Sequence, residues 1–378
     1  PFQPALSLLT LALGLLALPQ ISSAQHLETG SATFTESANG ADSTDPSGWV
    51  SVNFEQNFAE VPVVIVGPLS HGPGAEQDTS WSISLRLRNI STDGFEVAAT
   101  RPEGTVDLFD SSTNAAQAVT LTADWLAVPA GLHNLPDGTQ VEARVVDTIE
   151  VRAGTMLAGS GVSSAGEAIS LVHPFADAPG VLHSVQSQDD PEWITSTVFG
   201  TGNSGTAPDA TGFTIALEGA EVVLAHPSTG SAIPETIGWV AFSPAVGQVT
   251  DSNGNSRDYD AGRTAAYYIQ RHEDGCQPIP DTGSFGFSAI PDVLIKHNSM
   301  QGSNGAWARR CEPSDGGGAF LPAVTADNAW VHTDEDQASG LSDQDERGGL
   351  DEIAGWFAIE PGTWVALTES DHDSDGLP

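Results

Sequence analysis

Hydrophobic and polar residues alternate over short stretches along most of the chain. Between positions 81 and 88 the odd positions carry Trp, Ile, Leu and Leu, while the even positions carry Ser, Ser, Arg and Arg. Residues 49–54 alternate in the same way. A period of two is that of a half-buried β-strand. Glycine (40) and proline (24) are frequent and helical periods are scarce, so the chain is predicted to be all-β.

One arrangement of apolar residues occurs three times. Each copy opens with a Phe followed by a Pro and an apolar run, and closes with a Trp inside a second apolar run. The opening residues are Phe58, Phe175 and Phe287, and the closing residues are Trp125, Trp239 and Trp356. The spacings are 117 and 112 residues for Phe, and 114 and 117 for Trp. Two residues that recur at nearly the same spacing over this length predict three tandem domains of one fold.

The repeat places antiparallel β-sandwich domains at about 25–136, 140–262 and 263–368. Each is long enough to hold its own core. The closing Trp residues lie in apolar strands, so we expect them to pack in these cores rather than to stack on a sugar. Three fused copies could assemble as an internal pseudo-trimer, and a homo-oligomer is the alternative.

Residues 1–24 have the pattern of a signal peptide. The segment from Leu6 to Leu18 is apolar, and Ser22-Ser23-Ala24 is a small-residue cleavage site. The apolar run is short for a membrane span, and no other run approaches about 18 residues. We therefore expect a mature protein without a membrane span that is secreted, extracellular or attached to a cell surface.

The charge is strongly acidic, with 50 Asp and Glu against 12 Lys and Arg and a net charge of -38. Such a surface repels nucleic acid and anionic membranes, which excludes both as partners. It attracts cations, calcium above all. Solubility in a salty medium is the alternative explanation of the charge.

Cys276 and Cys311 are the two cysteines of the chain. In an exported protein one such pair predicts a disulfide, with two free buried thiols as the alternative.

Alternating carboxylates occur at 369–378, where Asp371, Asp373 and Asp375 precede Gly376. Carboxylate oxygens around a sharp turn are what calcium requires. The segment resembles the opening of a dockerin or thrombospondin type 3 calcium loop, and since the late ligand is absent we expect the natural chain to continue. Asp251, Asn253 and Asn255 form a weaker version, with Gly254 at a different place.

The first repeat resembles the H-type lectin family, the type found in snail agglutinin and at the C-terminus of discoidin. The residues that carry the likeness are Phe58 with Pro62-Val63-Val64-Ile65, the segment from Leu85 through Asp93-Gly94-Phe95, and Trp125-Leu126-Ala127-Val128. The second repeat shares Phe175, Pro179, Gly212-Phe213 and Trp239, and the third matches at its two ends. The resemblance implies a sandwich of about six strands that assembles as a trimer and binds a sugar.

The resemblance also indicates candidate sugar ligands. Family members contact the sugar with an Arg on the strand before the Gly-Phe turn, and Arg86 stands there. Arg88 shares its strand face, and the pair forms a basic spot that suggests an anionic sugar. A solvated strand face is the alternative. Trp81 is a candidate platform at a strand entry, with core packing as its alternative, and Arg101 follows the Gly-Phe segment where the family often has an aromatic and a His.

No catalytic motif stands out: Gly-x-Ser-x-Gly, His-Glu-x-x-His, a phosphate loop and Cys-x-x-Cys are all absent from the sequence. The chain is therefore expected to be non-enzymatic. The favoured hypothesis is a secreted or surface carbohydrate-binding protein whose partners are glycans. The alternatives are a calcium-stabilised structural or assembly protein without sugar binding, and a set of targeting modules from a larger secreted enzyme.

Overall fold

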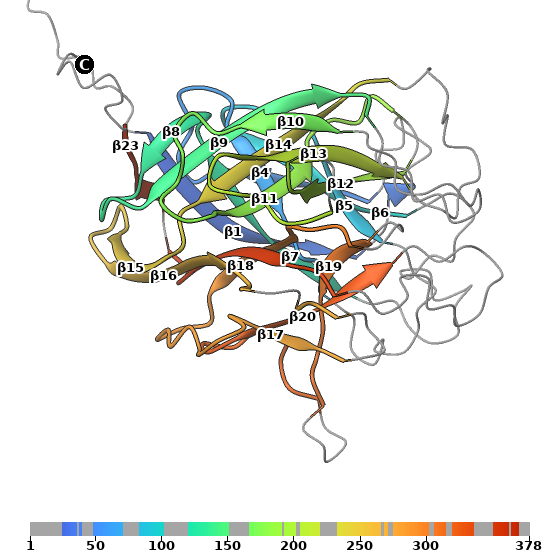
Figure 1. The fold of residues 1–378 in the computed structure, drawn as a ribbon. Helices are drawn as coiled ribbons and strands as arrows, with labels where there is room; N and C mark the ends of the chain where they lie inside the picture. The colour runs from blue at the N-terminus through green and yellow to red at the C-terminus, as the bar shows by residue number, and fades with distance from the viewer. Residues whose placement is uncertain are drawn as a thin grey trace, which may run out of the picture.

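The computed structural model describes residues 25–35, 38–39, 48–70, 83–101, 120–150, 166–190, 193–201, 205–219, 233–265, 268–270, 275–301, 306–314, 320–335, 351–362 and 364–369. These ranges consist of strands and connecting loops and contain no helix (Figure 1). The prediction of an all-β protein is confirmed. Within the described ranges there is accordingly no helix of the length and apolarity needed to cross a membrane.

The first two-sheet unit contains an inner and an outer antiparallel sheet. The inner sheet is built from β1 (His26–Phe34), β7 (Leu121–Val128) and β4 (Val63–Val66). The outer sheet is built from β3 (Trp49–Asn53), β6 (Gly94–Arg101) and β5 (Ser84–Arg88), with the short β2 (Ala38–Asn39) parallel to β6. Between the sheets lies a core that includes Phe58 and Trp125.

The second and third units repeat this strand order, and the third begins with the strand Ser256–Arg263, which lies almost wholly inside the range 140–262 expected for the second domain. The inner sheet of the second unit is built from β9 (Gln140–Thr148), β14 (Glu235–Phe242) and β11 (Gly180–Val185). The inner sheet of the third unit is built from β16 (Ser256–Arg263), β21 (Ala354–Ile359) and β18 (Asp292–His297). The outer sheet of the second unit is built from β10 (Glu167–Ser170), β13 (Gly212–Gly219) and β12 (Ile194–Phe199). The outer sheet of the third unit is built from β17 (Gln277–Ile279), β20 (Ala329–Glu335) and β19 (Ala306–Arg310). Trp239 and Trp356 are buried in the corresponding cores, so all three closing Trp residues pack inside as expected.

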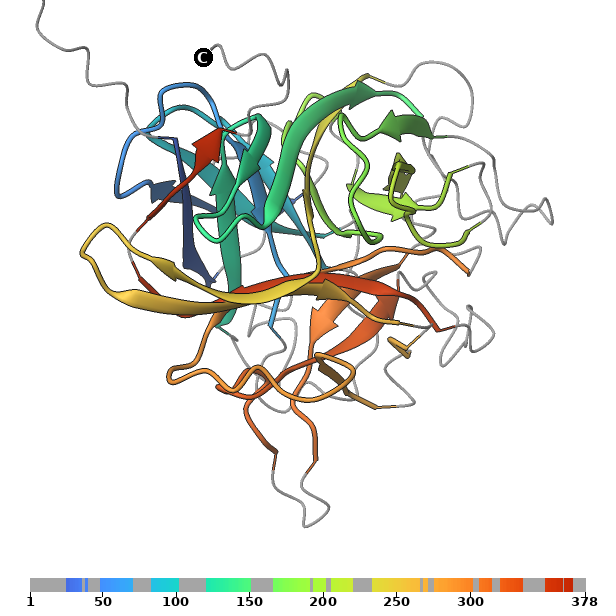
Figure 2. The same cartoon turned by 60° about the vertical axis from the view of Figure 1, so that its left-hand side comes forward.

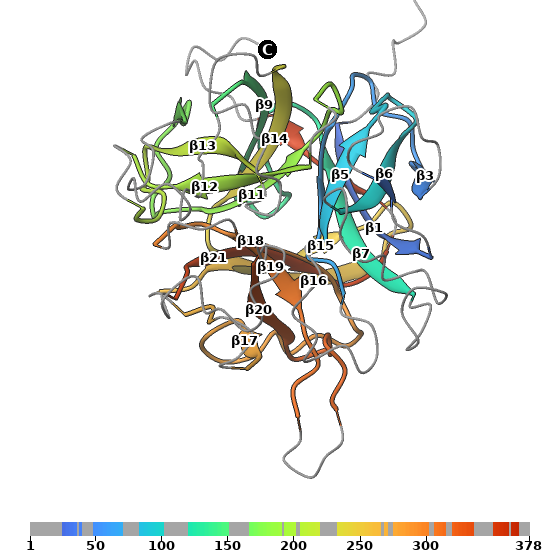
Figure 3. The same cartoon turned by 90° about the vertical axis from the view of Figure 1, so that its right-hand side faces the viewer.

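The three inner sheets also share one hydrophobic cluster. It contains Ile65 and Leu126 from the first unit, Leu182 and Val240 from the second, and Leu294 and Phe357 from the third. Every one of these side chains is fully buried. Because strand residues alternate between faces, each inner sheet buries one face in its own unit and the other against its neighbours. Figures 2 and 3 show the three units grouped around this common centre.

Short strands from the linkers extend each inner sheet. The strand β8 (Gly131–Asn134) pairs with β9, and β15 (Ala245–Thr250) pairs with β16. The corresponding partner of β1 comes from the other end of the chain, because β22 (Val365–Ala366) pairs with it. The last strand, β23 (Thr368–Glu369), then pairs with β8 (Figure 1). The segment after the third unit thus joins it back to the first and second units.

Polar side chains from a neighbouring unit cap the edge strands β4, β11 and β18. Gln186 Nε2 donates to the carbonyl of Val64 at 2.7 Å, and Asn298 bonds both backbone groups of Val181 at 2.8 and 2.6 Å. Asp124 Oδ2 accepts from the backbone N–H of Val293 at 2.8 Å. An unpaired strand edge is prone to wrong pairing, so these bonds both satisfy the edges and join the units.

The residue before each closing Trp decides which side chain provides the cap. Gly238 leaves room for Gln186, since a Cβ there would lie 1.8 Å from Gln186 Nε2. Gly355 leaves room for Asn298, whose Oδ1 would be 2.5 Å from an added Cβ. In the first unit Asp124 holds this position and provides the cap itself. The glycines thus matter here for the close approach of a side chain rather than for backbone conformation.

Candidate functional site

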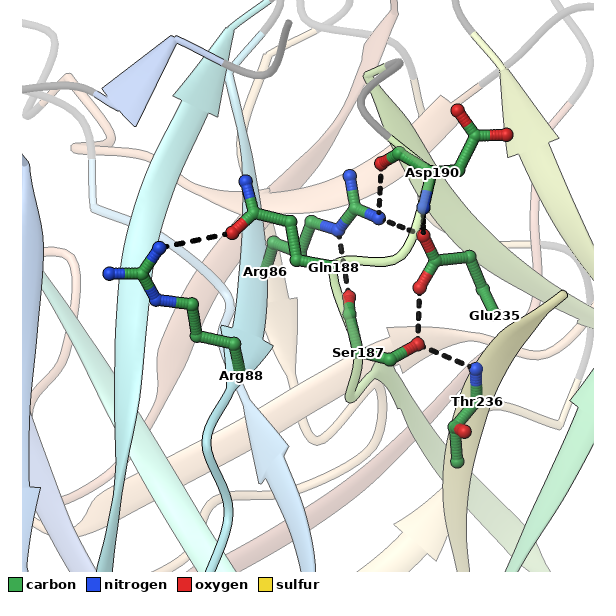
Figure 4. A network of polar contacts seen from close by, with 7 residues as sticks. All are labelled: Arg86, Arg88, Ser187, Gln188, Asp190, Glu235 and Thr236. Atoms are coloured by element: carbon green, nitrogen blue, oxygen red, sulfur yellow. Dashed lines mark hydrogen bonds and ion pairs between the residues drawn. The ribbon is translucent and has the colours of Figure 1, made fainter. Parts of the chain in front are cut away.

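Arg86 lies at the seam between the first and second units. Its side chain extends from β5 toward residues 187–190 of the second unit and is fully buried (Figure 4). Nε donates to the Ser187 carbonyl and Nη2 to the Asp190 carbonyl, both at 2.9 Å. Nη2 also forms an ion pair with Glu235. These three contacts join the first unit to the second.

Glu235 is held by bonds from its own unit as well. The backbone N–H of Asp190 donates to Glu235 Oε1 at 2.6 Å, and the Ser187 hydroxyl donates to Oε2. Burial lowers the pKa of Arg86 and raises the pKa of Glu235, and the attraction between the two charges offsets only part of each shift. Such a pair persists when the remaining polar atoms are also satisfied, as they largely are here.

This placement corrects the expectation for Arg86. The sequence suggested a sugar ligand or a solvated residue on a strand face, but the side chain has 0% exposure and its donors face protein acceptors. A sugar could reach the guanidinium only if the first two units separated. The cause is the second unit, which packs over the strand face that would be exposed in an isolated sandwich.

Arg88 lies two residues along the same strand and remains partly exposed, at 17% of its side chain. Its guanidinium lies 4.0 Å above the Trp49 ring, and Nε donates to Glu96 Oε2 at 2.7 Å. Nη1 donates to Gln188 Oε1 of the second unit at 3.2 Å (Figure 4). Asn89 Nδ2 donates to the same Glu96 oxygen at 2.7 Å. We call Trp49, Arg88, Asn89, Glu96 and Gln188 the Arg88 cluster.

The cluster is electrically balanced. Burial alone would raise the pKa of Glu96, but hydrogen bonds from Arg88 and Asn89 hold it below its ordinary value, so Glu96 is ionised at neutral pH. Its charge cancels that of Arg88. An anionic ligand would have to displace Glu96 and approach a chain of net charge -38, so this geometry does not favour the anionic sugar suggested by the sequence.

The cluster offers donors and acceptors in fixed positions. The aromatic face, the ion pair and two amides restrict the rotation of one another, which lowers the entropic cost of binding a ligand. The side chains come from β3, from β5 and the residue after it, from β6 and from the loop that follows β11. Planar donors and acceptors beside an aromatic ring suit a ligand with several hydroxyl groups.

Most of the remaining candidates from the sequence lie outside the part of the chain that the structure describes. Trp81 and the three carboxylates Asp371, Asp373 and Asp375 lie outside the described residues. Arg101 ends β6, where its backbone pairs with Asn39, and its side chain is also outside what is described. The calcium site and these two sugar ligands therefore remain predictions.

Asp251 uses its carboxylate within its own loop. Oδ1 accepts from the backbone N–H groups of Asn253 and Asn255, both at 2.9 Å, and Oδ2 accepts from Arg257 at 2.8 and 2.9 Å. These bonds overcome the effect of burial and lower the pKa of Asp251 to about 2. Arg257 thus occupies the place that the alternating pattern suggested for calcium.

Cys276 and Cys311 form a disulfide, with their Cα atoms 5.9 Å apart, which confirms the expected pairing. The bond ties the segment before β17 to the residue that follows β19 in the third unit.

Sequence reasoning missed Glu96, Gln188 and Trp49. Glu96 could have been found, because the turn at Asp93-Gly94 places it opposite Arg88 in a hairpin. Gln188 lies 100 residues away in another unit and has no local signal.

Comparisons with family models, curated proteins and solved structures gave no match to this chain. The likeness to H-type lectins thus depends on the motif residues given above.

Proposed function

We propose that the protein is a non-catalytic carbohydrate-binding protein, secreted or displayed at a cell surface. Its binding site would be the Arg88 cluster, and its ligand a neutral glycan rich in hydroxyl groups. The observation that carries this proposal is the position of Arg88, fixed between Trp49 and Glu96 while part of its side chain stays exposed.

Charge and geometry support the choice of ligand. A balanced ion pair with adjacent amides can donate to and accept from vicinal hydroxyls without taking up a net charge. The strongly acidic chain would weaken binding of sialic or uronic acids, because no unpaired cation in the cluster compensates the repulsion. The motif likeness to H-type lectins supports the same class of ligand.

We also propose that the three units act as an internal pseudo-trimer. The shared cluster of Ile65, Leu182 and Leu294 and the cyclic caps from Gln186, Asn298 and Asp124 support this arrangement. The Arg88 cluster would then be a composite site, since Gln188 comes from the neighbouring unit.

A glycan array that carries neutral and acidic sugars tests the proposal. The wild-type chain should bind neutral glycans, and Trp49→Ala should lose most of the signal because Arg88 loses the ring beneath it. Trp49→Phe keeps an aromatic face and should retain binding. Silence of the wild-type chain on every glycan would refute sugar binding, and binding confined to acidic glycans would refute the proposed ligand class.

A structural role in a calcium-stabilised assembly is the second candidate. It is favoured by Arg86, because a residue at the family's ligand position serves here to hold two units together. Under this hypothesis the array is silent, and calcium raises the melting temperature of the chain relative to a chelator. Replacing Asp371 and Asp373 by Asn should remove that shift if the carboxylate segment binds the ion.

A further inference from the structure

The outer sheet of the third unit brings both cysteines next to a histidine. One ligand atom each from Cys276, Cys311 and His332 lie within 4.8 Å of one another. Cys311 and His332 are buried, at 2% and 4% exposure, and Cys276 is half-buried. The three residues thus form a compact group of nitrogen and sulfur ligands on the central strand β20 and beside it.

Strand register explains how they come together. Gln277 pairs with Val331, so Cys276, one residue earlier, lies beside His332. On the other side of β20, Arg309 pairs with His332, and the backbone N–H of Cys311 donates to the Trp330 carbonyl at 3.0 Å. Residues at alternate positions share a face, so all three side chains lie on the face opposite the core residue Val331.

The fold does not require a histidine at this position. In the first outer sheet Ala98 lies opposite Arg86, and in the second Ala216 lies opposite Thr197, as His332 lies opposite Arg309 in the third. Two alanines show that a methyl group satisfies the packing. Among these three matching positions, a histidine occurs only in the third unit, which also contains both cysteines of the chain.

Two thiolates and an imidazole select soft or borderline cations rather than calcium. In a tetrahedral zinc site, bond lengths of about 2.3 Å to sulfur and 2.0–2.1 Å to nitrogen place neighbouring ligand atoms about 3.6–3.8 Å apart. The three ligand atoms lie within 4.8 Å of one another, and once the S–S bond is broken the two sulfurs must move apart to reach that spacing. Arg309 lies opposite His332 on the neighbouring strand, and its Nη1 forms an ion pair with Asp334 at 2.8 Å.

We propose that Cys276, Cys311 and His332 form a zinc site when the disulfide is reduced, so that the same atoms alternate between a disulfide and a metal centre. A dithiol reductant would supply two electrons and two protons, break the S–S bond and become a disulfide itself. Binding of Zn²⁺ would then release the two thiol protons and leave a fourth position for water or another ligand.

The test uses the full chain, with a water-soluble phosphine as reductant because it does not compete as a thiol for the metal. The phosphine breaks the S–S bond, takes an oxygen atom from water to become its oxide, and leaves two thiols. Cobalt(II) then replaces zinc as the spectroscopic probe. Because carboxylates of this acidic chain also bind cations, the readout is the thiolate-to-cobalt charge-transfer absorption and not the total metal bound.

The reduced chain should show this absorption at one cobalt per chain, and added Zn²⁺ should abolish it. The oxidised chain and the double variant Cys276→Ser/Cys311→Ser should lack it. His332→Gln retains both thiols and should weaken affinity more than about tenfold, the lower end of the loss caused by removing a second-shell partner. Near-UV circular dichroism monitors folding in each state.

Three results would overturn the proposal. One is the absence of the thiolate band when two free thiols are detected in a folded chain. Another is an unchanged affinity in His332→Gln, which would exclude the imidazole as a ligand. If reduction unfolds the chain, failure of Zn²⁺ to restore the near-UV signal would also contradict the site.

Discussion

Arg86 and Arg88 are two residues apart on one strand, share one strand face and both reach the second unit, yet their surroundings differ. Arg86 is fully buried and bonds Ser187, Asp190 and Glu235. Arg88 remains partly exposed above Trp49 and bonds Glu96 of its own unit and Gln188 of the next. One arginine therefore lies buried between the units, and the other remains partly exposed at their edge.

The difference shows that strand position alone does not assign a role to a side chain. In an isolated sandwich both arginines would face solvent, as strand alternation implies. The second unit covers the inner end of this face and leaves its outer end open. Burial makes an ion pair sensitive to the loss of either partner, whereas exposure makes it nearly dispensable for folding.

The largest effect is expected for Arg86→Ala. Removing the guanidinium leaves Glu235 buried without its cation, and such a loss costs about 3–5 kcal/mol of the free energy of unfolding. Urea denaturation followed by tryptophan fluorescence measures it.

A double variant sharpens this result. Replacing the pair together, as Arg86→Met and Glu235→Leu, removes both charges and should recover most of the lost stability. Equal losses in the single and double variants would mean that Arg86 acts through packing and not through its ion pair.

Asp292, at the seam that joins the third unit to the first, should make the chain more stable as pH falls. A carboxylate that stabilises the fold in its ionised form has the opposite effect. Burial, and then the charge of Asp124, raise the pKa of Asp292 from 3.8 to about 6, although Thr29 donates to it at 2.9 Å. A folded-state pKa above the unfolded one means that stability increases as pH falls through about 6 toward 4. At pH 8 the ionised carboxylate therefore opposes folding.

Asp292→Asn removes that charge and should stabilise the chain at pH 8. At 1.36 kcal/mol per pKa unit, the gain is at most about 3 kcal/mol. The gain should disappear near pH 4, where the wild-type carboxyl is protonated as well. Urea denaturation at both pH values measures it, and a variant less stable than wild type at pH 8 would contradict the assignment.

Gly238→Ala tests the cap at the seam that contains Arg86. An added Cβ would lie 1.8 Å from Gln186 Nε2 and displace the amide from the Val64 carbonyl. Overpacking of this kind costs about 1–3 kcal/mol. In Gly238→Ala/Gln186→Ala the overlap is gone, so the two substitutions should couple by at least about 0.5 kcal/mol in denaturation experiments. Strict additivity would show that the amide does not depend on the glycine.

The smallest effect on stability is expected for Arg88→Ala. A partly exposed pair such as Arg88 with Glu96 contributes about 0–1 kcal/mol, since water solvates both partners when they separate. Urea denaturation of this variant beside Arg86→Ala provides the direct contrast. Losses of similar size in both would remove the distinction between the two arginines.

The sequence predicts the fold better than the site. Strand alternation and the repeated Phe and Trp landmarks depend on local burial, and Trp125, Trp239 and Trp356 are buried as expected. Two cysteines sufficed to predict the disulfide. The role of Arg86 could not be predicted, because Glu235 lies 149 residues away and contributes only through packing between units. Glu96 is an intermediate case, since hairpin register indicates it once the turn is recognised.

The most direct test of the central claim is the affinity of Arg88→Ala for the neutral glycan bound most strongly on the array, measured by titration calorimetry. Arg144→Ala, at an arginine with a 46% exposed side chain outside the cluster, is the matched control. We predict that the control binds as the wild type does, whereas Arg88→Ala loses at least about tenfold in affinity, or 1.4 kcal/mol, while remaining folded. Equal affinity in wild type and Arg88→Ala would contradict a sugar site at the Arg88 cluster.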